Sequence, residues 1–276
     1  MLSLRLNTRS RRALCWVLFA TLNLVITPAM AKGPSLDLLA ATPIGSWQIR
    51  EDYNTSPRGK RTVSVVKTSM LGEETRNGER YYWVEMVQNE FKLRKSKKGE
   101  KRKPTGDQIV TKTLLPASTF TADPANAIAN LSGVGEEMII QTGNSDPIIM
   151  RGAGALASSF MQGSGGNISF DFAEQGTEQV AVTAGTFDTT IMSGTGSVTV
   201  DAVFKQITVT SKTTGWYSEQ IPFGIVKSTG ETTTNGKTTT NESQLIEYGM
   251  SGATSLITKT PQEMPNLEGL LGGGSN

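Results

Sequence analysis

The sequence predicts an all-β, mostly antiparallel protein with a single large domain, and three observations predict it. Apolar and polar residues alternate with a period of two along most of the chain. The alternating runs are rich in β-branched and aromatic residues and are bounded by glycine, proline and asparagine. The connections between them are short, which favours an antiparallel meander over parallel crossovers.

Four strands are expected in the first part of the chain. From Trp47 to Tyr53 apolar side chains alternate with polar ones, Gln48 and Arg50 among the polar set. Thr62 to Thr68 has the β-branched content of a second strand. The third, Tyr81 to Phe91, is long and apolar on both faces and follows an Asn77-Gly78 turn signal. Gln108 to Leu115 supplies the fourth.

A helical and glycine-rich insert is expected at about 118–166. Pro124 to Leu131 favours one or two helical turns, because proline suits the first position of a helix. Glu137 to Gln141 favours a short strand. Gly152 to Met161 has helical spacing, and Gly163 to Gly166 then ends it as a flexible hinge.

Strands resume after the insert and continue almost to the end of the chain. They are expected at Ile168–Phe172, Thr177–Thr183, Thr186–Met192, Ser197–Thr210, Trp216–Tyr217, Phe223–Ser228 and Gln244–Tyr248. The apolar parity changes within Ser197–Thr210, which predicts a bulge or turn near Lys205-Gln206. The domain is expected to span 32–260, followed by a flexible tail at 261–276.

Residues 1–31 have the three parts of an export signal peptide. Arginines between Arg5 and Arg12 precede an apolar run from Ala13 to Thr27. This run is shorter than the ~20 residues that span a bilayer. Ala29-Met30-Ala31 then supplies a small-x-small cleavage site, so the mature protein is expected in the periplasm of a Gram-negative bacterium, by Sec export in preference to twin-arginine export.

Removal of this segment changes the composition. The chain has 27 basic and 25 acidic residues, and the loss of four signal arginines leaves a net charge of about −2, which offers no case for nucleic-acid binding. The only cysteine, Cys15, also leaves, and the chain contains no histidine. Histidine triads, thiol catalysis and zinc-thiolate sites are therefore excluded, and neither enzymatic activity nor a metal or cofactor is expected.

The segment from Lys92 to Lys103 concentrates positive charge, with eight basic residues and a single acid. It joins two expected strands, so one interpretation is a solvated hairpin tip. The other is contact with the headgroups of an anionic membrane or lipopolysaccharide. The basic residues are Lys92, Arg94, Lys95, Lys97, Lys98, Lys101, Arg102 and Lys103.

An ordered series of motifs in the C-terminal half carries a resemblance. It consists of Ala184–Thr189, Trp216–Ser218, Ile221–Ser228 and Leu245–Gly249. The series resembles uncharacterised bacterial periplasmic β proteins that are similar in pattern to the LolA/LolB-like lipoprotein-carrier half-barrels. The resemblance covers about Thr177 to Gly252 and implies a half-barrel or clam-like curved sheet covered by one or two short helices.

The same resemblance implies non-catalytic binding of a hydrophobic cell-envelope ligand, either a lipid or a lipoprotein acyl chain. The expected ligand-binding residues on the concave face are Trp47, Trp83, Leu156, Phe160, Trp216 and Phe223. Ordinary core packing is the other interpretation of each, because aromatic residues dominate any β core. Two alternative functions stay open: a structural or protein-interaction component of the envelope that pairs through its strand edges, and a hydrolase that uses carboxylates alone.

Overall fold

The computed structural model describes residues 42–96, 99–117, 136–152, 167–202 and 205–263, and all regular structure among them is β-strand. The two expected helices lie outside the described residues, except for Gly152, which lies at a bend. The described part of the chain holds no helix long and apolar enough to cross a membrane. The strands are β1 (Trp47–Thr55), β2 (Arg61–Arg76), β3 (Glu79–Ser96), β4 (Gly99–Pro104), β5 (Ile109–Pro116), β6 (Glu137–Thr142), β7 (Ile148–Arg151), β8 (Asn167–Val182), β9 (Gly185–Ala202), β10 (Lys205–Tyr217), β11 (Ile225–Thr234), β12 (Lys237–Gly249) and β13 (Gln262–Glu263).

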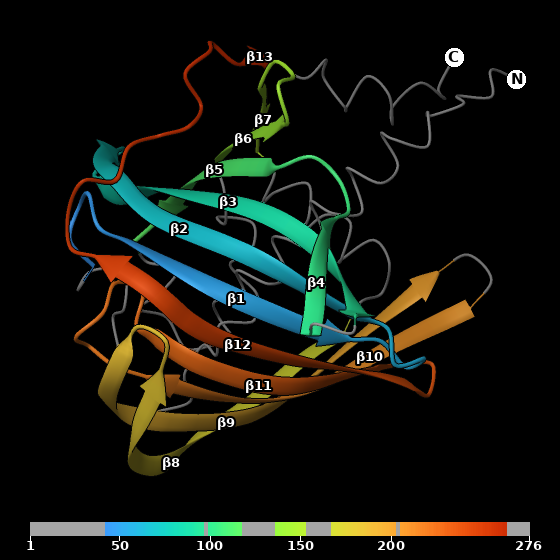
Figure 1. Cartoon of the computed structure of the whole chain (residues 1–276). Helices are drawn as coiled ribbons and strands as arrows, with labels where there is room; N and C mark the ends of the chain where they lie inside the picture. The colour runs from blue at the N-terminus through green and yellow to red at the C-terminus, as the bar shows by residue number, and fades with distance from the viewer. Residues whose placement is uncertain (1–41, 97–98, 118–135, 153–166, 203–204, 264–276) are drawn as a thin grey trace, which may run out of the picture.

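All the strands belong to one 13-stranded sheet, in the order β13-β7-β6-β5-β3-β2-β1-β12-β11-β10-β9-β8, with β4 paired to β3 outside this path. The ladders are antiparallel apart from the short one between β13 and β7. Two meanders make up the sheet, β1 to β7 and β8 to β12 (Figure 1). They are joined by the ladder between β1 and β12, which runs from Trp47 opposite Gly249 to Thr55 opposite Thr240.

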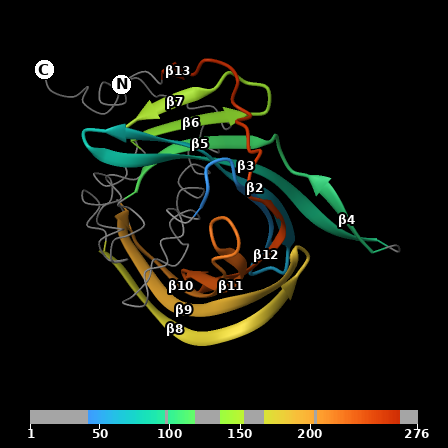
Figure 2. The same cartoon turned by 90° about the vertical axis from the view of Figure 1, so that its left-hand side faces the viewer.

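The sheet curls so that its two meanders face each other, but it does not close into a barrel (Figure 2). The loop between β10 and β11 lies between the two meanders (Figure 2). We call the concave side of the sheet its inner face and the convex side its outer face. The all-β, mostly antiparallel, curved architecture is therefore confirmed.

Turn chemistry follows the sequence at the hairpins. Asn77 and Gly78 have φ values of 50° and 82° and form the predicted two-residue turn between β2 and β3. Asn235 and Gly236, with φ values of 52° and 73°, make the same turn between β11 and β12. The parity change near Lys205 marks a hairpin, because Lys205 pairs with Ala202, so the expected strand at 197–210 is two strands.

Three expected boundaries are corrected. The short strand expected at Glu137–Gln141 is present as β6, but the insert also contributes β7; β6 pairs with β5 and β7 pairs with β6, so both extend the first meander. The two strands expected between Ile168 and Thr183 are one strand, β8, with a bulge between Glu174 and Gly176. Gln262 and Glu263, expected in the flexible tail, pair with β7.

After β12 the chain crosses the outer face of the first meander to reach β7, and we call residues 250–261 the crossing segment (Figure 1). Its anchor is Glu85, whose side chain is 1% exposed. The Glu85 carboxylate accepts hydrogen bonds from the Ser255 hydroxyl (2.5 Å) and the Leu256 backbone N–H (2.9 Å). Two charge-assisted hydrogen bonds compensate the burial of this carboxylate and fix the segment in place.

Candidate functional site on the inner face

The inner face of the first meander is rich in methionine. Directly opposed residues of an antiparallel ladder carry their side chains on the same face. One such row crosses five strands and contains Met70, Val84, Thr113, Met138 and Met150. Met86 lies in the neighbouring row, opposite Thr68. Methionine is unbranched and polarisable, so this face can adapt to irregular apolar shapes.

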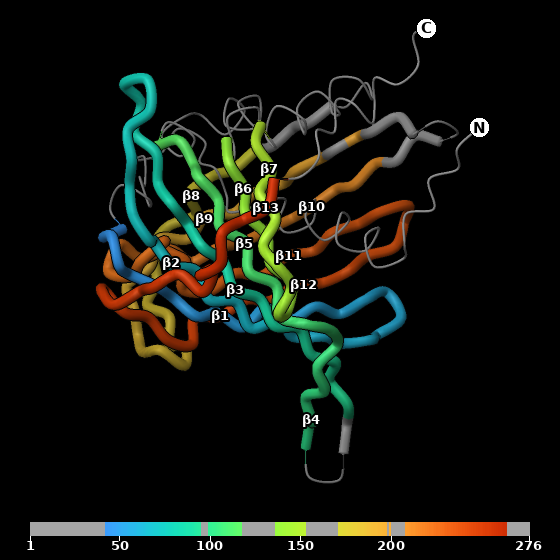
Figure 3. The backbone as a smooth tube through the Cα atoms, turned by 90° about the horizontal axis from the view of Figure 1, so that it is seen from above, coloured from blue at the N-terminus to red at the C-terminus, as the bar shows by residue number. Residues whose placement is uncertain are grey.

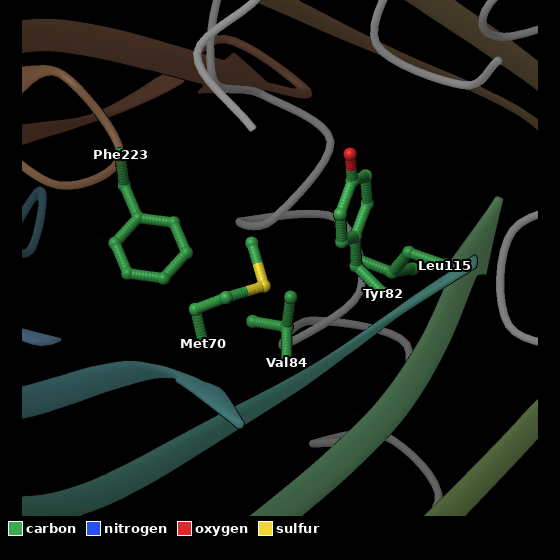
Figure 4. Close-up of a cluster of buried hydrophobic side chains, with 5 residues drawn as sticks. All are labelled: Met70, Tyr82, Val84, Leu115 and Phe223. Carbon is green, nitrogen blue, oxygen red and sulfur yellow. The ribbon is translucent and has the colours of Figure 1, made fainter. Parts of the chain in front are cut away.

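Phe223 packs against this face from the loop between β10 and β11. It forms a buried cluster with Met70, Tyr82, Val84 and Leu115, in which the Phe223 ring lies next to Met70 (Figure 4). Its backbone has φ of 60°, which is unfavourable for a bulky side chain. The Phe223 N–H donates a 2.9 Å hydrogen bond to Thr42 Oγ1, which helps to hold this conformation. Phe223 therefore packs in a buried core cluster on the inner side of the sheet, and its role in ligand binding stays a prediction.

Three polar side chains on the inner face lack partners. Gln48 and Tyr217 are 1% and 2% exposed, and Arg50 is half-buried. Among the described residues, Gln48 Oε1, Arg50 Nε and the Tyr217 hydroxyl are buried without a hydrogen-bond partner. We call these three residues the Arg50 cluster. Buried polar groups of this kind are uncommon in folded proteins, since each costs the free energy of a lost hydrogen bond.

The members of the Arg50 cluster come from two strands of the sheet. Gln48 and Arg50 lie on β1, whereas Tyr217 lies on β10, and the two strands β12 and β11 lie between them in the sheet order. Burial raises the pKa of the Tyr217 hydroxyl, and the positive charge of Arg50 acts in the opposite direction. Arg50 makes no ion pair with any acid in the described part of the chain.

The three described tryptophans lie on the outer face, which corrects their expected place on the concave face. Trp47, Trp83 and Trp216 are sequence neighbours of the inner-face residues Gln48, Val84 and Tyr217, and successive residues of a strand face opposite ways. A lysine ammonium lies over each indole ring, 4.9 to 5.1 Å from the ring centroid. The lysines are Lys67 over Trp47, Lys112 over Trp83 and Lys227 over Trp216. Leu156 and Phe160 lie outside the described residues.

An open groove of about 820 Å³ crosses the outer face of β1 and β8 to β12. Its lining includes the charged side chains of Arg61, Asp171, Lys212, Glu231 and Glu242. Threonine, serine, glycine and asparagine make up most of the remainder. This composition does not suit an acyl chain, because apolar ligands need predominantly apolar walls.

The β3–β4 hairpin separates its basic residues onto two faces. In its register Lys92 opposes Lys103 and Arg94 opposes Lys101, so these four exposed cations share one face. Arg102 lies on the other face.

Ion pairs dock that other face of the hairpin onto the sheet. Arg102 bonds to Glu51 Oε1 at 2.5 Å, and Glu100 accepts from Arg61 at 2.6 Å. The hairpin projects away from the body of the protein (Figure 3). Lys97 and Lys98, and the side chain of Lys95, lie outside the described residues.

Sequence reasoning placed Gln48 and Arg50 on the polar, outward side of the first strand and did not select Tyr217 as a site residue. The alternation at Trp47 to Tyr53 was correct in period but opposite in phase. Period two separates the faces of a strand without showing which face is concave. No local signal in the sequence marks the Arg50 cluster, since its members are far apart along the chain.

Comparison with known proteins gave structural similarities only. No family model and no curated protein matches the chain. A crystal structure from Parabacteroides distasonis, provisionally described as a lipoprotein, is similar with a TM-score of 0.36 and 14% identity, over 76% of this chain and 98% of that one. A provisionally described exported protein with a YmcC-like fold from Bacteroides fragilis is similar with a TM-score of 0.31 and 16% identity, over 75% of this chain and 97% of that one.

Proposed function

We propose that this is an exported cell-envelope protein that binds a hydrophobic ligand, a lipid or a lipoprotein acyl chain, on the inner face of its half-barrel. The observation that carries the proposal is the methionine-rich inner face, with Met70, Met86, Met138 and Met150 on four strands of the first meander of a curved sheet. A flexible acyl chain favours a wall that repacks around it, and methionine supplies such a wall. Export is proposed from the signal-like segment at 1–31.

Thermal unfolding of the mature protein, with and without a panel of envelope lipids, tests the proposal. Native mass spectrometry and solvent extraction of the purified protein will identify any lipid that accompanies it. The wild type should gain thermal stability with its lipid, as any ligand of the folded state produces. Met86→Glu places a charge on the inner face and should abolish the gain, whereas Met250→Glu, at a position that is 49% exposed, should retain it. No co-purifying lipid and no stability gain across the panel would contradict the proposal.

The basic face of the β3–β4 hairpin suits a role in reaching an anionic membrane surface. Like charges directly opposite each other destabilise a ladder, and here Lys92, Arg94, Lys101 and Lys103 form two such pairs. An anionic surface removes this repulsion, and each basic residue near it contributes about 1 kcal/mol of binding free energy, screened by salt.

Substitution of these four residues by glutamine tests the membrane role of the hairpin. Co-sedimentation with phosphatidylglycerol vesicles at low salt should fall strongly in this variant. A control with glutamine at Lys60, Lys212 and Lys237, all exposed elsewhere on the sheet, should bind as the wild type does. Equal binding of the hairpin variant and the wild type would remove the hairpin from the proposal.

A second candidate function, pairing with an envelope protein, is favoured by β8. This 16-residue strand ends the sheet path, and its residues 173–179 are exposed. An open edge can accept a strand from a partner. Charged side chains and bulges on an edge strand disfavour pairing with another chain, and β8 has both: Glu174, Glu178 and the bulge between Glu174 and Gly176. We therefore rank this function second. Thr177→Pro should abolish capture of an envelope protein and leave lipid binding intact if this function holds.

A further inference from the structure

Each member of the Arg50 cluster has one buried polar atom without a hydrogen-bond partner among the described residues. A buried polar group without a partner loses its hydration and gains nothing in exchange. The atoms concerned are Gln48 Oε1, Arg50 Nε and the Tyr217 hydroxyl oxygen. Among the described residues, no acid forms an ion pair with Arg50. A polar ligand that reaches the inner face would supply the hydrogen bonds that these three atoms lack among the described residues.

The cluster is continuous with the methionine-rich inner face. Gln48 pairs with Thr68, which in turn pairs with Met86, so the three lie in one row across β1, β2 and β3. Arg50 lies two residues beyond Gln48 on the same face of β1. The inner face therefore presents an apolar wall that ends in a polar cluster, which is the profile of an amphiphile with one polar end.

The chemistry of the cluster selects the sign of that polar end. The guanidinium of Arg50 is always charged and presents donors in a planar fork that matches the oxygens of a carboxylate or phosphate. The Tyr217 hydroxyl adds a donor, and the Gln48 side chain presents an amide donor when its orientation is reversed. A cationic head would meet an unscreened positive charge, and a neutral head would leave the guanidinium unpaired.

We infer that the Arg50 cluster binds the anionic head of an acyl ligand, a carboxylate or a phosphate, while the inner-face methionines hold its chain. The inference rests on the proposed function and names the class of ligand for the same face. Arg50 provides the charge, and Tyr217 and Gln48 orient the oxyanion. The ligand is thus an acidic amphiphile.

Calorimetric titration of the mature protein with four compounds that share a sixteen-carbon chain tests this inference. The probes are hexadecanoate, hexadecyl phosphate, hexadecanol and hexadecylamine, each below its aggregation concentration. Hexadecanoate or hexadecyl phosphate should bind about 30-fold or more tightly than hexadecanol, the effect expected for a buried charge pair. The tighter of these two anions distinguishes a fatty acid head from a phospholipid head, and hexadecylamine should bind most weakly.

Variants then assign the preference to the cluster. Arg50→Met should remove the preference for the anion and leave hexadecanol affinity within about twofold of wild type, because the apolar wall is unchanged. Tyr217→Phe should reduce the preference in part. Arg58→Met, at an exposed turn position, is the matched control and should keep the wild-type preference. If Arg50→Met does not fold, Arg50→Lys is titrated with the same four compounds. Its preference for the anions over hexadecanol should be smaller than that of the wild type, since lysine keeps the charge without the planar fork of donors.

The outcomes separate the two proposals. Equal affinities for hexadecanoate, hexadecyl phosphate and hexadecanol in the wild type overturn the anionic-head inference and leave the proposed apolar binding intact. A preference that persists in Arg50→Met also overturns it. No binding of any of the four compounds overturns the proposed function itself.

Discussion

The inner and outer faces of this sheet are made by alternate residues of the same strands, yet their chemistry differs sharply. The inner face carries methionines and the unpartnered Arg50 cluster. The outer face carries tryptophans beneath lysines, and its polar groups find partners in ion pairs such as Arg102 with Glu51. The tryptophans therefore do not mark the concave side, because an indole covered by a lysine stem is stable at a half-exposed surface.

The largest expected effect on stability lies in the inner core. Met70 is fully buried and contacts Phe223, so Met70→Ala should lower the free energy of unfolding by about 2–5 kcal/mol. Urea unfolding measures the change. A loss below ~1 kcal/mol would show that the inner face is loosely packed and would weaken its contrast with the outer face.

Substitution of two glycines, one next to a buried inner-face ring and one next to an outer-face ring, compares how tightly the two faces are packed. A Cβ at Gly215 would lie 2.5 Å from the fully buried Tyr217 ring, and a Cβ at Gly249 would lie 2.6 Å from Trp47. Gly215→Ala should cost about 1–3 kcal/mol because the buried ring cannot move aside.

Gly249→Ala should cost less than Gly215→Ala, since Trp47 is half-exposed and can rotate. Thermal unfolding of both variants measures the difference, and equal losses would contradict the contrast between the two faces. Gly106→Ala, with no atom within 4 Å of the added Cβ, is the neutral control.

Trp216→Ala tests a tryptophan of the outer face. Trp216 is half-exposed under Lys227 but also packs against a buried cluster that includes Phe187, so its removal should cost about 1–3 kcal/mol, less than that of a fully buried tryptophan. Calorimetric titration should show unchanged binding of a sixteen-carbon ligand. If the Trp216→Ala protein is stable but no longer binds the sixteen-carbon ligand, Trp216 is a ligand-binding residue after all.

The smallest effect concerns the hairpin and depends on pH. The hydrogen bond from Arg102 lowers the pKa of Glu51 from its ordinary value of 4.5. The contribution of the Glu51–Arg102 interaction to the free energy of unfolding is complete above pH 4.5. It is lost as the pH falls through the lowered pKa of Glu51 in the folded state.

Because both side chains are partly exposed, Arg102→Met should cost about 0.2–1 kcal/mol at pH 7 and less in acid. Unfolding free energies measured between pH 2 and pH 7 test this dependence. Arg94→Met, on the other face of the hairpin, should leave the dependence unchanged.

Much of the fold can be predicted from short-range sequence patterns, whereas the Arg50 cluster cannot. The Asn77-Gly78 hairpin and the parity change near Lys205 were visible because turn chemistry and strand period are short-range. The pairing of β1 with β12 and the outward phase of Trp47 depend on contacts between distant segments, and no short-range pattern contains them. Gln48 and Arg50 were assigned to solvent as polar residues, although the curl of the sheet encloses them with Tyr217.

The ladder between β1 and β12 also sets an order of events during synthesis. Residues 47–55 are made early, but one of their two neighbouring strands, residues 237–249, is made after almost all of the described sheet. Until then the first meander exposes β1 as a bare edge, the kind of surface that recruits other strands. Such distant pairing also slows folding. A chain that ends before residue 237 would keep this edge permanently, so truncation should produce aggregation rather than a smaller folded protein.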